Sequence, residues 1–245
     1  MKNFKPIAIA IFVAIFSSSA LTAQDKTGEI TTTTEITVKP GHHAQFVEGV
    51  KKWKECYLEN NGQRKWGVWK REQGEGNVYV LVGTMKNWAE MDSDDPVNEA
   101  CYMTLLNFIS PHVEKVNYNI SQVMPEVSRT WPADGKLAWV TYYKVRKGYA
   151  FKEVITAVSG AINDKEGSSR GLWREYKGGA SDAPDYMVAT PFKSFAELDV
   201  KRDTPAKIYS EAVGEEKANE MRDKWFDTVL DSWSHIFVLQ PELSN

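Results

Sequence analysis

The four histidines are the side chains of this sequence best suited to move a proton near neutral pH. An imidazole can act as a general base, as a proton donor or as the axial ligand of an iron. His112 lies late in an expected helix, and His235 lies at the start of an expected strand. We take these two as the candidate catalytic residues, with ordinary packing or solvation as the alternative. His42 and His43 follow an expected strand, at a helix start, where side chains are usually solvated.

Aromatic residues make up 12% of the chain, with nine Trp, ten Tyr and ten Phe. Such side chains can line a cavity that stacks against a flat or apolar ligand, or they can fill the core between two sheets. We expect most of them to belong to the core. The candidate ligand-binding residues are Trp69, Tyr79, Trp139, Tyr143, Trp173 and Tyr186, with Lys70 or Arg174 near the mouth of the cavity.

The composition is that of an ordinary folded protein, with 245 residues, 42% of them hydrophobic and 26% charged. The formal net charge is −3, and the chain contains no long basic run, so nothing indicates a nucleic-acid partner. The sequence shows no Ser-His-Asp spacing, no nucleotide-binding glycine loop and no HExxH zinc motif. It therefore specifies neither a cofactor nor a metal.

Residues 1–23 have the three parts of a secretory signal peptide. Lys2 and Lys5 precede an apolar stretch at 7–16, and small residues end at Ala23. Because the apolar stretch is short, cleavage before Gln24 is favoured over an uncleaved membrane anchor. We expect an exported protein, periplasmic or secreted, without a stable membrane anchor after cleavage.

Cys56 and Cys101 are the two cysteines of the chain. An oxidising compartment and an even count make one disulfide plausible, with two buried free thiols as the alternative. Cys56 lies near the end of one expected helix and Cys101 near the start of the next, so antiparallel packing of the two helices would bring them together. In the chain-entropy model, such a bridge stabilises by roughly 4 kcal/mol.

The sequence repeats itself. Residues 79–92 align without gaps on residues 186–199, with Tyr, Lys, Ala, Glu and Asp identical. Three shorter blocks extend the match: 38–41 with 145–148, 67–70 with 171–174, and 120–128 with 236–244. We expect a first repeat at 24–128, a linker at 129–136 and a second repeat at 137–245, because residues 129–136 combine Pro, Gly and Asp.

Each repeat reads as strand, helix, strand, strand, helix, strand. In the first repeat the expected strands are 29–39, 65–72, 77–85 and 118–124, and the second helix is 96–114. In the second repeat the corresponding segments include strands at 170–177, 185–191 and 235–240, and a helix at 205–230. Short helical turns are expected around Trp88 and Phe195. This order predicts two tandem ferredoxin-like α+β units, each with both helices on one face of an antiparallel sheet.

The other face of each sheet also has to be covered. The strands carry large apolar residues on both faces, as Trp66, Val68 and Trp69 illustrate. The simplest partner is the sheet of the other repeat, packed face to face. We therefore expect a monomer that forms its pseudo-dimer within one chain, with a homodimer as the alternative.

These features resemble the dimeric α+β barrel superfamily, including its antibiotic biosynthesis monooxygenase-like and NIPSNAP-like members. The resemblance rests on residues 38–41 with Phe46, on the strand that contains Trp69, and on the turn at 86–90. It covers nearly all of the mature chain and implies a barrel fold. Members include cofactor-independent oxygenases, haem-degrading enzymes, haem peroxidases, lactone isomerases and polyketide cyclases, so the resemblance alone assigns no activity.

Three functional hypotheses follow. The first is an exported barrel protein that binds a small apolar or aromatic molecule. The second is a cofactor-independent monooxygenase- or cyclase-like enzyme, in which a His or Tyr moves a proton within an apolar cavity. The third is a haem-binding protein that uses His112 or His235. The residues are compatible both with binding alone and with catalysis.

Overall fold

The computed structural model of the chain describes residues 28–245. The predicted signal peptide at residues 1–23 lies outside the described residues. The first half contains β1 (Ile30–Val38), α1 (His43–Glu59), β2 (Trp66–Arg71), β3 (Asn77–Met85), η1 (Trp88–Asp92), α2 (Pro96–Ala100), α3 (Tyr102–Phe108), η2 (Ser110–His112) and β4 (Val113–Val123). The second half contains β5 (Leu137–Val145), α4 (Gly148–Glu166), β6 (Leu172–Gly178), β7 (Tyr186–Phe192), η3 (Phe195–Asp199), α5 (Pro205–Val213), α6 (Glu215–Thr228) and β8 (Val229–Leu239).

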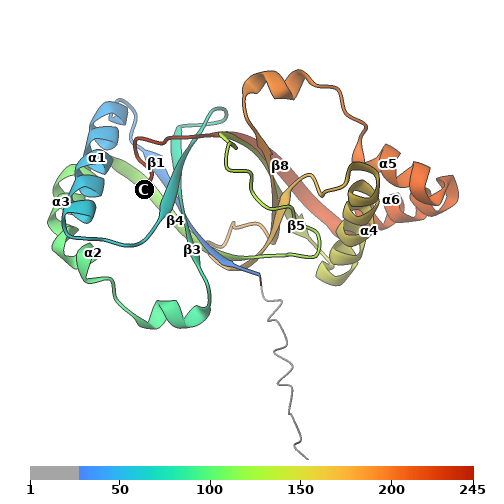
Figure 1. The fold of residues 1–245 in the computed structure, drawn as a ribbon, viewed down its shortest axis with the longest axis horizontal. Helices are drawn as coiled ribbons and strands as arrows, with labels where there is room; N and C mark the ends of the chain where they lie inside the picture. Colours follow the sequence, from blue (N-terminus) through green and yellow to red (C-terminus); the bar gives the residue numbers. More distant parts are fainter. Residues whose placement is uncertain (1–27) are drawn as a thin grey trace, which may run out of the picture.

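The strands close into one antiparallel barrel in the order β1-β3-β2-β8-β5-β7-β6-β4. Each half supplies four adjacent strands, β4-β1-β3-β2 and β8-β5-β7-β6, which is the strand order of a ferredoxin-like sheet. Two seams join the halves, where β2 pairs with β8 and β4 pairs with β6. The helices lie outside the barrel on opposite sides (Figure 1). The predicted α+β fold of two face-to-face repeats is confirmed.

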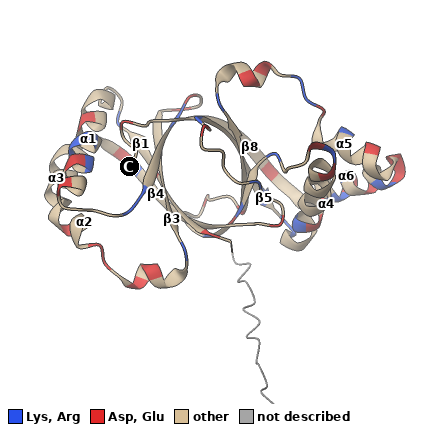
Figure 2. Cartoon of the chain, viewed as in Figure 1, with Lys and Arg blue, Asp and Glu red and all other residues tan. Residues whose placement is uncertain are grey.

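Charged residues lie over the outside of this body. Figure 2 shows acidic and basic residues interspersed on both helix layers. None of the helices within residues 28–245 is both long enough and apolar enough to cross a bilayer.

The second long helix predicted in each half is interrupted. Residues 96–112 form the three short elements α2, α3 and η2, and Pro111 within η2 cannot donate a helical hydrogen bond. In the second half α5 ends at Gly214, whose φ of 86° breaks the helix before α6. Because these helices end early, β4 and β8 begin at Val113 and Val229, several residues before the predicted strands.

A disulfide joins the two helical segments of the first half. Cys56 near the end of α1 is bonded to Cys101 between α2 and α3, with 5.9 Å between their Cα atoms. The bond closes a loop of 45 residues and holds α1 against the segment that follows.

Each half sends its tail into the core of the other. After β4, Val127 is fully buried with Phe151, Ile155 and Tyr186 of the second half. After β8, Leu243 is fully buried with Phe46 and Tyr57 of the first half, among others. The matched blocks at 120–128 and 236–244 are therefore alike because both perform the same exchange.

The exchanged tails also show which residues of the two halves are equivalent. The backbone N–H of Val68 donates to Ser244 Oγ at 2.9 Å, and the N–H of Trp173 donates to Ser128 Oγ at 2.8 Å. Val68 is therefore the structural counterpart of Trp173. The alignment of residues 67–70 on 171–174, which equates Trp69 with Trp173, is wrong by one residue.

Strand pairing gives the same correction. Trp69 pairs with Val80, and Arg174 pairs with Met187. Because Val80 and Met187 are equivalent in the 79–92 and 186–199 repeat, the counterpart of Trp69 is Arg174. A shift of one residue turns a side chain to the opposite face of a sheet, so Trp69 and Trp173 lie on opposite faces of the barrel wall.

Truncation of an exchanged side chain tests this interdependence. Leu243→Ala removes a fully buried side chain from the opposite half, and we expect the free energy of unfolding to fall by about 2–5 kcal/mol. Leu230→Ala is the matched control because Leu230 is 56% exposed, and its effect should stay within about 0.5 kcal/mol. Urea unfolding of the whole chain measures both. Equal effects of the two substitutions would contradict the exchanged packing.

Candidate functional site

The barrel wall separates two cavities. Along β5, Val140 and Tyr142 face the barrel interior, while Trp139, Thr141 and Tyr143 face the helices, as the alternation of a strand requires. The interior cavity, which we call the lumen, has a volume of about 630 Å³. The cavity between the outer face of β5, β6 and β7 and helices α4, α5 and α6, which we call the helix-side cleft, has a volume of about 1120 Å³.

Aromatic side chains form one wall of the helix-side cleft. Tyr143 stacks on Trp173, with ring centroids 5.8 Å apart and planes inclined by 20°. Trp225 of α6 meets the Tyr143 ring edge-on at 5.4 Å. Trp139 and Phe226 also line the cleft, and they remain 41% and 70% exposed. The wall therefore presents large apolar surfaces that no protein side chain covers.

Helix α4 supplies the facing aliphatic wall. Val154, Ile155, Val158 and Ile162 recur at the spacing that places them on one side of a helix, and all four line the cleft. Small residues of the cleft include Ser159 on α4 and Ala218 on α6. An apolar molecule entering here would contact aromatic rings on one side and branched aliphatic groups on the other.

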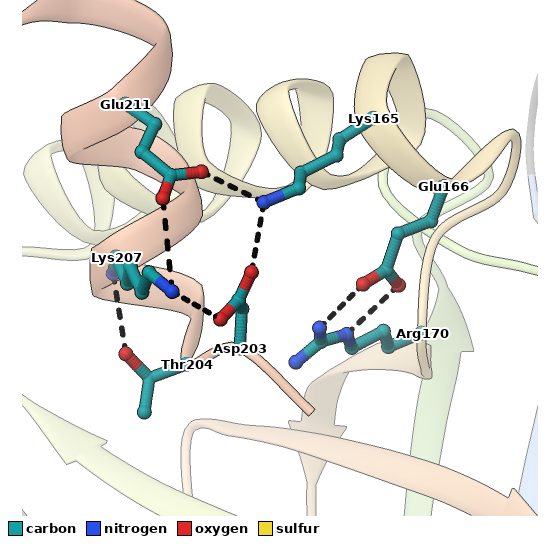
Figure 3. A network of polar contacts seen from close by, with 7 residues as sticks. All are labelled: Lys165, Glu166, Arg170, Asp203, Thr204, Lys207 and Glu211. Atoms are coloured by element: carbon teal, nitrogen blue, oxygen red, sulfur yellow. Dashed lines mark hydrogen bonds and ion pairs between the residues drawn. The ribbon is translucent and has the colours of Figure 1, made fainter. Parts of the chain in front are cut away.

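A network of ion pairs fixes the rim of the cleft (Figure 3). Lys165 at the end of α4 contacts Asp203 at 2.9 Å and Glu211 of α5 at 2.7 Å. Lys207 contacts the same Asp203 carboxylate at 2.6 Å. Helix α5 packs against α4 and α6, and these ion pairs lie at the exposed edge of its contact with α4.

Two further contacts shape the same rim. Thr204 caps α5, since its Oγ1 accepts a hydrogen bond from the backbone N–H of Lys207 at 3.2 Å. Arg170 grips Glu166 through two guanidinium nitrogens, as Figure 3 shows. Arg170, Asp203 and Thr204 all line the cleft, so its mouth is polar while its wall is apolar.

Burial and charge set the protonation of two cleft residues in opposite ways. Burial raises the pKa of Tyr143 to about 12, so its phenol stays protonated at neutral pH. Hydrogen bonds from Lys207 and Lys165 lower the pKa of Asp203 to about 2, so its carboxylate stays ionised.

The corresponding region of the first half is filled. Phe46 and Tyr57 of α1 pack there with Trp66, Val68 and Tyr79 in one buried cluster. The disulfide holds the helices of this half together. Both cysteines of the chain lie here, so the second half has no such bond. The helix-side cleft is thus a feature by which the second half departs from the first.

The structure distributes the predicted ligand-binding residues over three environments. Trp139, Tyr143 and Trp173 line the helix-side cleft. Tyr79 and Tyr186 are buried between the barrel wall and the helices, against Phe46 and Phe151 respectively. Trp69 faces the lumen. The six residues therefore do not form one site.

The two candidate catalytic histidines lie in different parts of the structure. His235 faces the lumen from the middle of β8 rather than opening that strand. His112 lies outside both cavities, with its Nδ1 atom 2.8 Å from Nδ1 of His42. Neither histidine lines the helix-side cleft.

Sequence reasoning missed Trp225, Phe226 and Met221, which α6 contributes to the cleft. Their surroundings explain the omission, because α6 is otherwise rich in charged residues and its apolar stripe is narrow. Trp225 and Phe226 next to one another on a polar helix were the available signal.

No family model and no curated protein matches the chain. Solved structures do match it. An anthrone oxidase-like protein superposes with a TM-score of 0.53 at 10% identity, over 89% of this chain and 92% of its own. A proposed monooxygenase of Fusobacterium nucleatum gives a TM-score of 0.52 at 10% identity, over 86% and 92%. This is the dimeric α+β barrel fold.

A third solved structure extends the comparison. A mutant chlorite dismutase of Candidatus Nitrospira defluvii, solved with cyanide, superposes with a TM-score of 0.52 at 8% identity, over 87% of this chain and 92% of its own. At these identities the likeness concerns the fold, and it carries over no site residue.

The residues fit neither a haem held by His112 nor a haem held by a histidine in the helix-side cleft. The larger cavity, the helix-side cleft, has no histidine among the residues of 28–245 that line it. His112 contacts His42 outside both cavities, and His235 shares the smaller lumen with Arg71 and Tyr142. We therefore assign no step to a haem.

The low pKa of Asp203 makes a prediction about acid stability. A carboxylate whose pKa is lowered by folding stabilises the protein above its ordinary pKa of 3.8, and that contribution is lost as the pH falls towards about 2. We expect Asp203→Asn to lower the free energy of unfolding at neutral pH, and the difference from wild type to vanish over this acid range.

Unfolding measured as a function of pH tests it. The control is Asp164→Asn, an exposed α4 residue beside Lys165 for which no ion pair is found within residues 28–245. High salt should shrink the Asp203 effect, because exposed ion pairs are screened. A difference that persists unchanged to acid pH would contradict the role of this carboxylate.

Proposed function

We propose that this chain is an exported protein that binds a small apolar or aromatic molecule in the helix-side cleft. The observation that carries the proposal is the exposed aromatic surface of Trp139 and Phe226, which together with Tyr143 and Trp173 lines a cavity of about 1120 Å³. Ligand cavities are concave and mostly apolar, with a few polar groups that orient the ligand. The polar rim around Asp203 and Arg170 supplies such groups.

The energetics favour occupancy of the cleft. Each Å² of apolar surface removed from water stabilises by roughly 25 cal/mol. A flat ring placed against Trp139 and Phe226 would cover side chains that are otherwise 41% and 70% exposed. Offset or edge-on contacts with aromatic rings add to this burial, which supports an aromatic ligand in particular.

The residues of the cleft support binding better than turnover. The Tyr143 phenol, with its pKa raised to about 12, can donate a hydrogen bond but cannot accept a proton at neutral pH. A cofactor-independent monooxygenase- or cyclase-like reaction needs a base beside the substrate. The two candidate histidines lie elsewhere, and the Asp203 carboxylate at the rim is a weak base because its pKa is lowered to about 2. We therefore propose a binding protein rather than an enzyme.

Export and assembly complete the proposal. The signal-like segment at residues 1–23 and the pairing of Cys56 with Cys101 support a periplasmic or secreted protein. The two halves cover one another's sheets and exchange their tails, which supports a monomeric pseudo-dimer rather than a homodimer.

A substitution that fills the cleft tests the binding site. Ala218→Trp places an indole in the cleft, whereas Ala212→Trp places it on the exposed side of α5, outside the cleft. The probe is N-phenyl-1-naphthylamine, an uncharged aromatic molecule whose fluorescence rises in apolar surroundings. We expect wild type and Ala212→Trp to bind it alike, and Ala218→Trp to bind it at least about tenfold more weakly, a loss of about 1.4 kcal/mol.

Circular dichroism and urea unfolding of both variants show whether the indole is accommodated. A wild-type chain that does not bind the probe, or an Ala218→Trp chain that is folded and binds it unchanged, would contradict the proposed site.

A further inference from the structure

The lumen is lined by apolar, aromatic and charged side chains. Its apolar wall includes Val80, Val140, Met187 and Phe237, and its aromatic wall includes Trp69 and Trp131, whose rings meet edge-on at 5.6 Å. Polar groups face the same space, namely Glu35, Arg71, Tyr142, Arg174, Tyr176 and His235. A volume of about 630 Å³ lies within the range of small-molecule sites.

The polar groups are not a requirement of the fold. Strand register makes Trp69 equivalent to Arg174, and two residues further along the strands it makes Arg71 equivalent to Tyr176. By the same pairing, Glu35 corresponds to Tyr142, and Asn119 corresponds to His235. Both halves build the same barrel with different residues at these positions, so the arginines are not needed to close it.

The two arginines lack anionic partners. Within residues 28–245, neither Arg71 nor Arg174 forms an ion pair with a carboxylate. Arg174 donates through Nε to the hydroxyl of Thr31 at 3.1 Å, and Arg71 donates through Nη2 to the carbonyl of Glu75. A buried guanidinium held only by neutral acceptors is costly, and a bound anion would offset that cost.

Among residues 28–245, two buried side-chain nitrogen atoms have no hydrogen-bond partner. They are Nε of Arg71 and Nδ1 of His235. Both residues lie against the hairpin glycine Gly74. A Cβ atom added to Gly74 would be 3.5 Å from the Arg71 guanidinium and 3.4 Å from Cε1 of His235, so the two side chains lie side by side. A carboxylate placed here would accept from Arg71 Nε, whose donor is otherwise unused.

Charge and stacking specify the ligand further. On the inner wall Arg71 and Arg174 outnumber the single carboxylate of Glu35. At the exposed rims Glu29 and Asp182 outnumber Lys65, and the charge of Glu29 favours charged Arg174. Burial raises the pKa values of Tyr142 and Tyr176, which keeps both phenols neutral and able to donate. Tyr142 also stacks on Trp233 at 5.5 Å, so flat rings already pack in this space.

We infer that the lumen is a second binding site, for a small aromatic carboxylate whose ring lies among Trp69, Tyr142 and Phe237. Arg71 beside His235 holds the carboxylate, and Arg174 adds positive charge to the same space. The site is separated from the helix-side cleft by the barrel wall, and the inference does not depend on the ligand proposed for that cleft.

Matched ligands test the inference in the unaltered mature chain. Calorimetric titration compares 2-naphthoate with 2-naphthalenemethanol, which has the same ring system without the negative charge. We expect 2-naphthoate to bind at least about tenfold more tightly, because a charge-assisted hydrogen bond to a guanidinium is stronger than one to a neutral hydroxyl. Equal affinities, or no binding of 2-naphthoate, would overturn the inference.

Matched variants locate the site. Arg71→Gln and Arg174→Gln should each reduce the preference for 2-naphthoate, while Lys70→Gln should leave it unchanged, because Lys70 is the neighbour of Arg71 on the opposite face of β2. Urea unfolding identifies any variant that fails to fold, and the comparison of ligands in the unaltered chain does not depend on that variant.

The filled-cleft variant separates this site from the one proposed above. We expect Ala218→Trp to retain the preference for 2-naphthoate. Loss of that preference in Ala218→Trp would place the carboxylate in the helix-side cleft and overturn the lumen site, whereas loss of N-phenyl-1-naphthylamine binding alone concerns only the cleft.

Discussion

The exchange of tails is the packing interaction on which the rest of the structure depends. Val127 fills the core of the second half and Leu243 fills the core of the first. Ser128 and Ser244 then accept hydrogen bonds from the strand of the opposite half. Because neither core is complete without the other chain segment, the two repeats must close one barrel. The wall of that barrel separates the lumen from the helix-side cleft.

The repeated architecture makes departures from symmetry informative. Both halves must build strands, seams and exchanged tails, so residues that they share are accounted for by the fold. The first half is packed beneath its helices and pinned by a disulfide. The second half leaves Trp139 of β5 and Phe226 of α6 exposed beside the helix-side cleft, and ion pairs of Lys165 lie at the rim of that cleft. Inside the barrel, Arg71 and Arg174 occupy positions where the other half has different residues. The helix-side cleft and the arginines of the lumen therefore lie where one half differs from the other.

The sequence predicts the fold well because duplication and periodicity are properties of whole segments. Matched blocks predict two repeats, and the order of their elements predicts the ferredoxin-like sheets that the barrel contains. The sequence does not determine equally well which side of the barrel wall each side chain faces. An ungapped alignment equated Trp69 with Trp173, although a shift of one residue sends them to opposite faces. Trp225 and Phe226 were hidden in a charged helix, and the unpartnered Arg71 depends on barrel closure, which brings distant strands together.

Native mass spectrometry of the protein recovered from its own cells tests the central claim most directly, namely that one chain closes its own barrel and leaves a cavity for a small molecule. We predict the mass of a single chain, with an added mass of a small organic molecule that gentle activation releases. A dimer that persists on dilution would contradict closure within one chain, and a single chain that carries no added mass and takes up no aromatic compound would contradict the binding function.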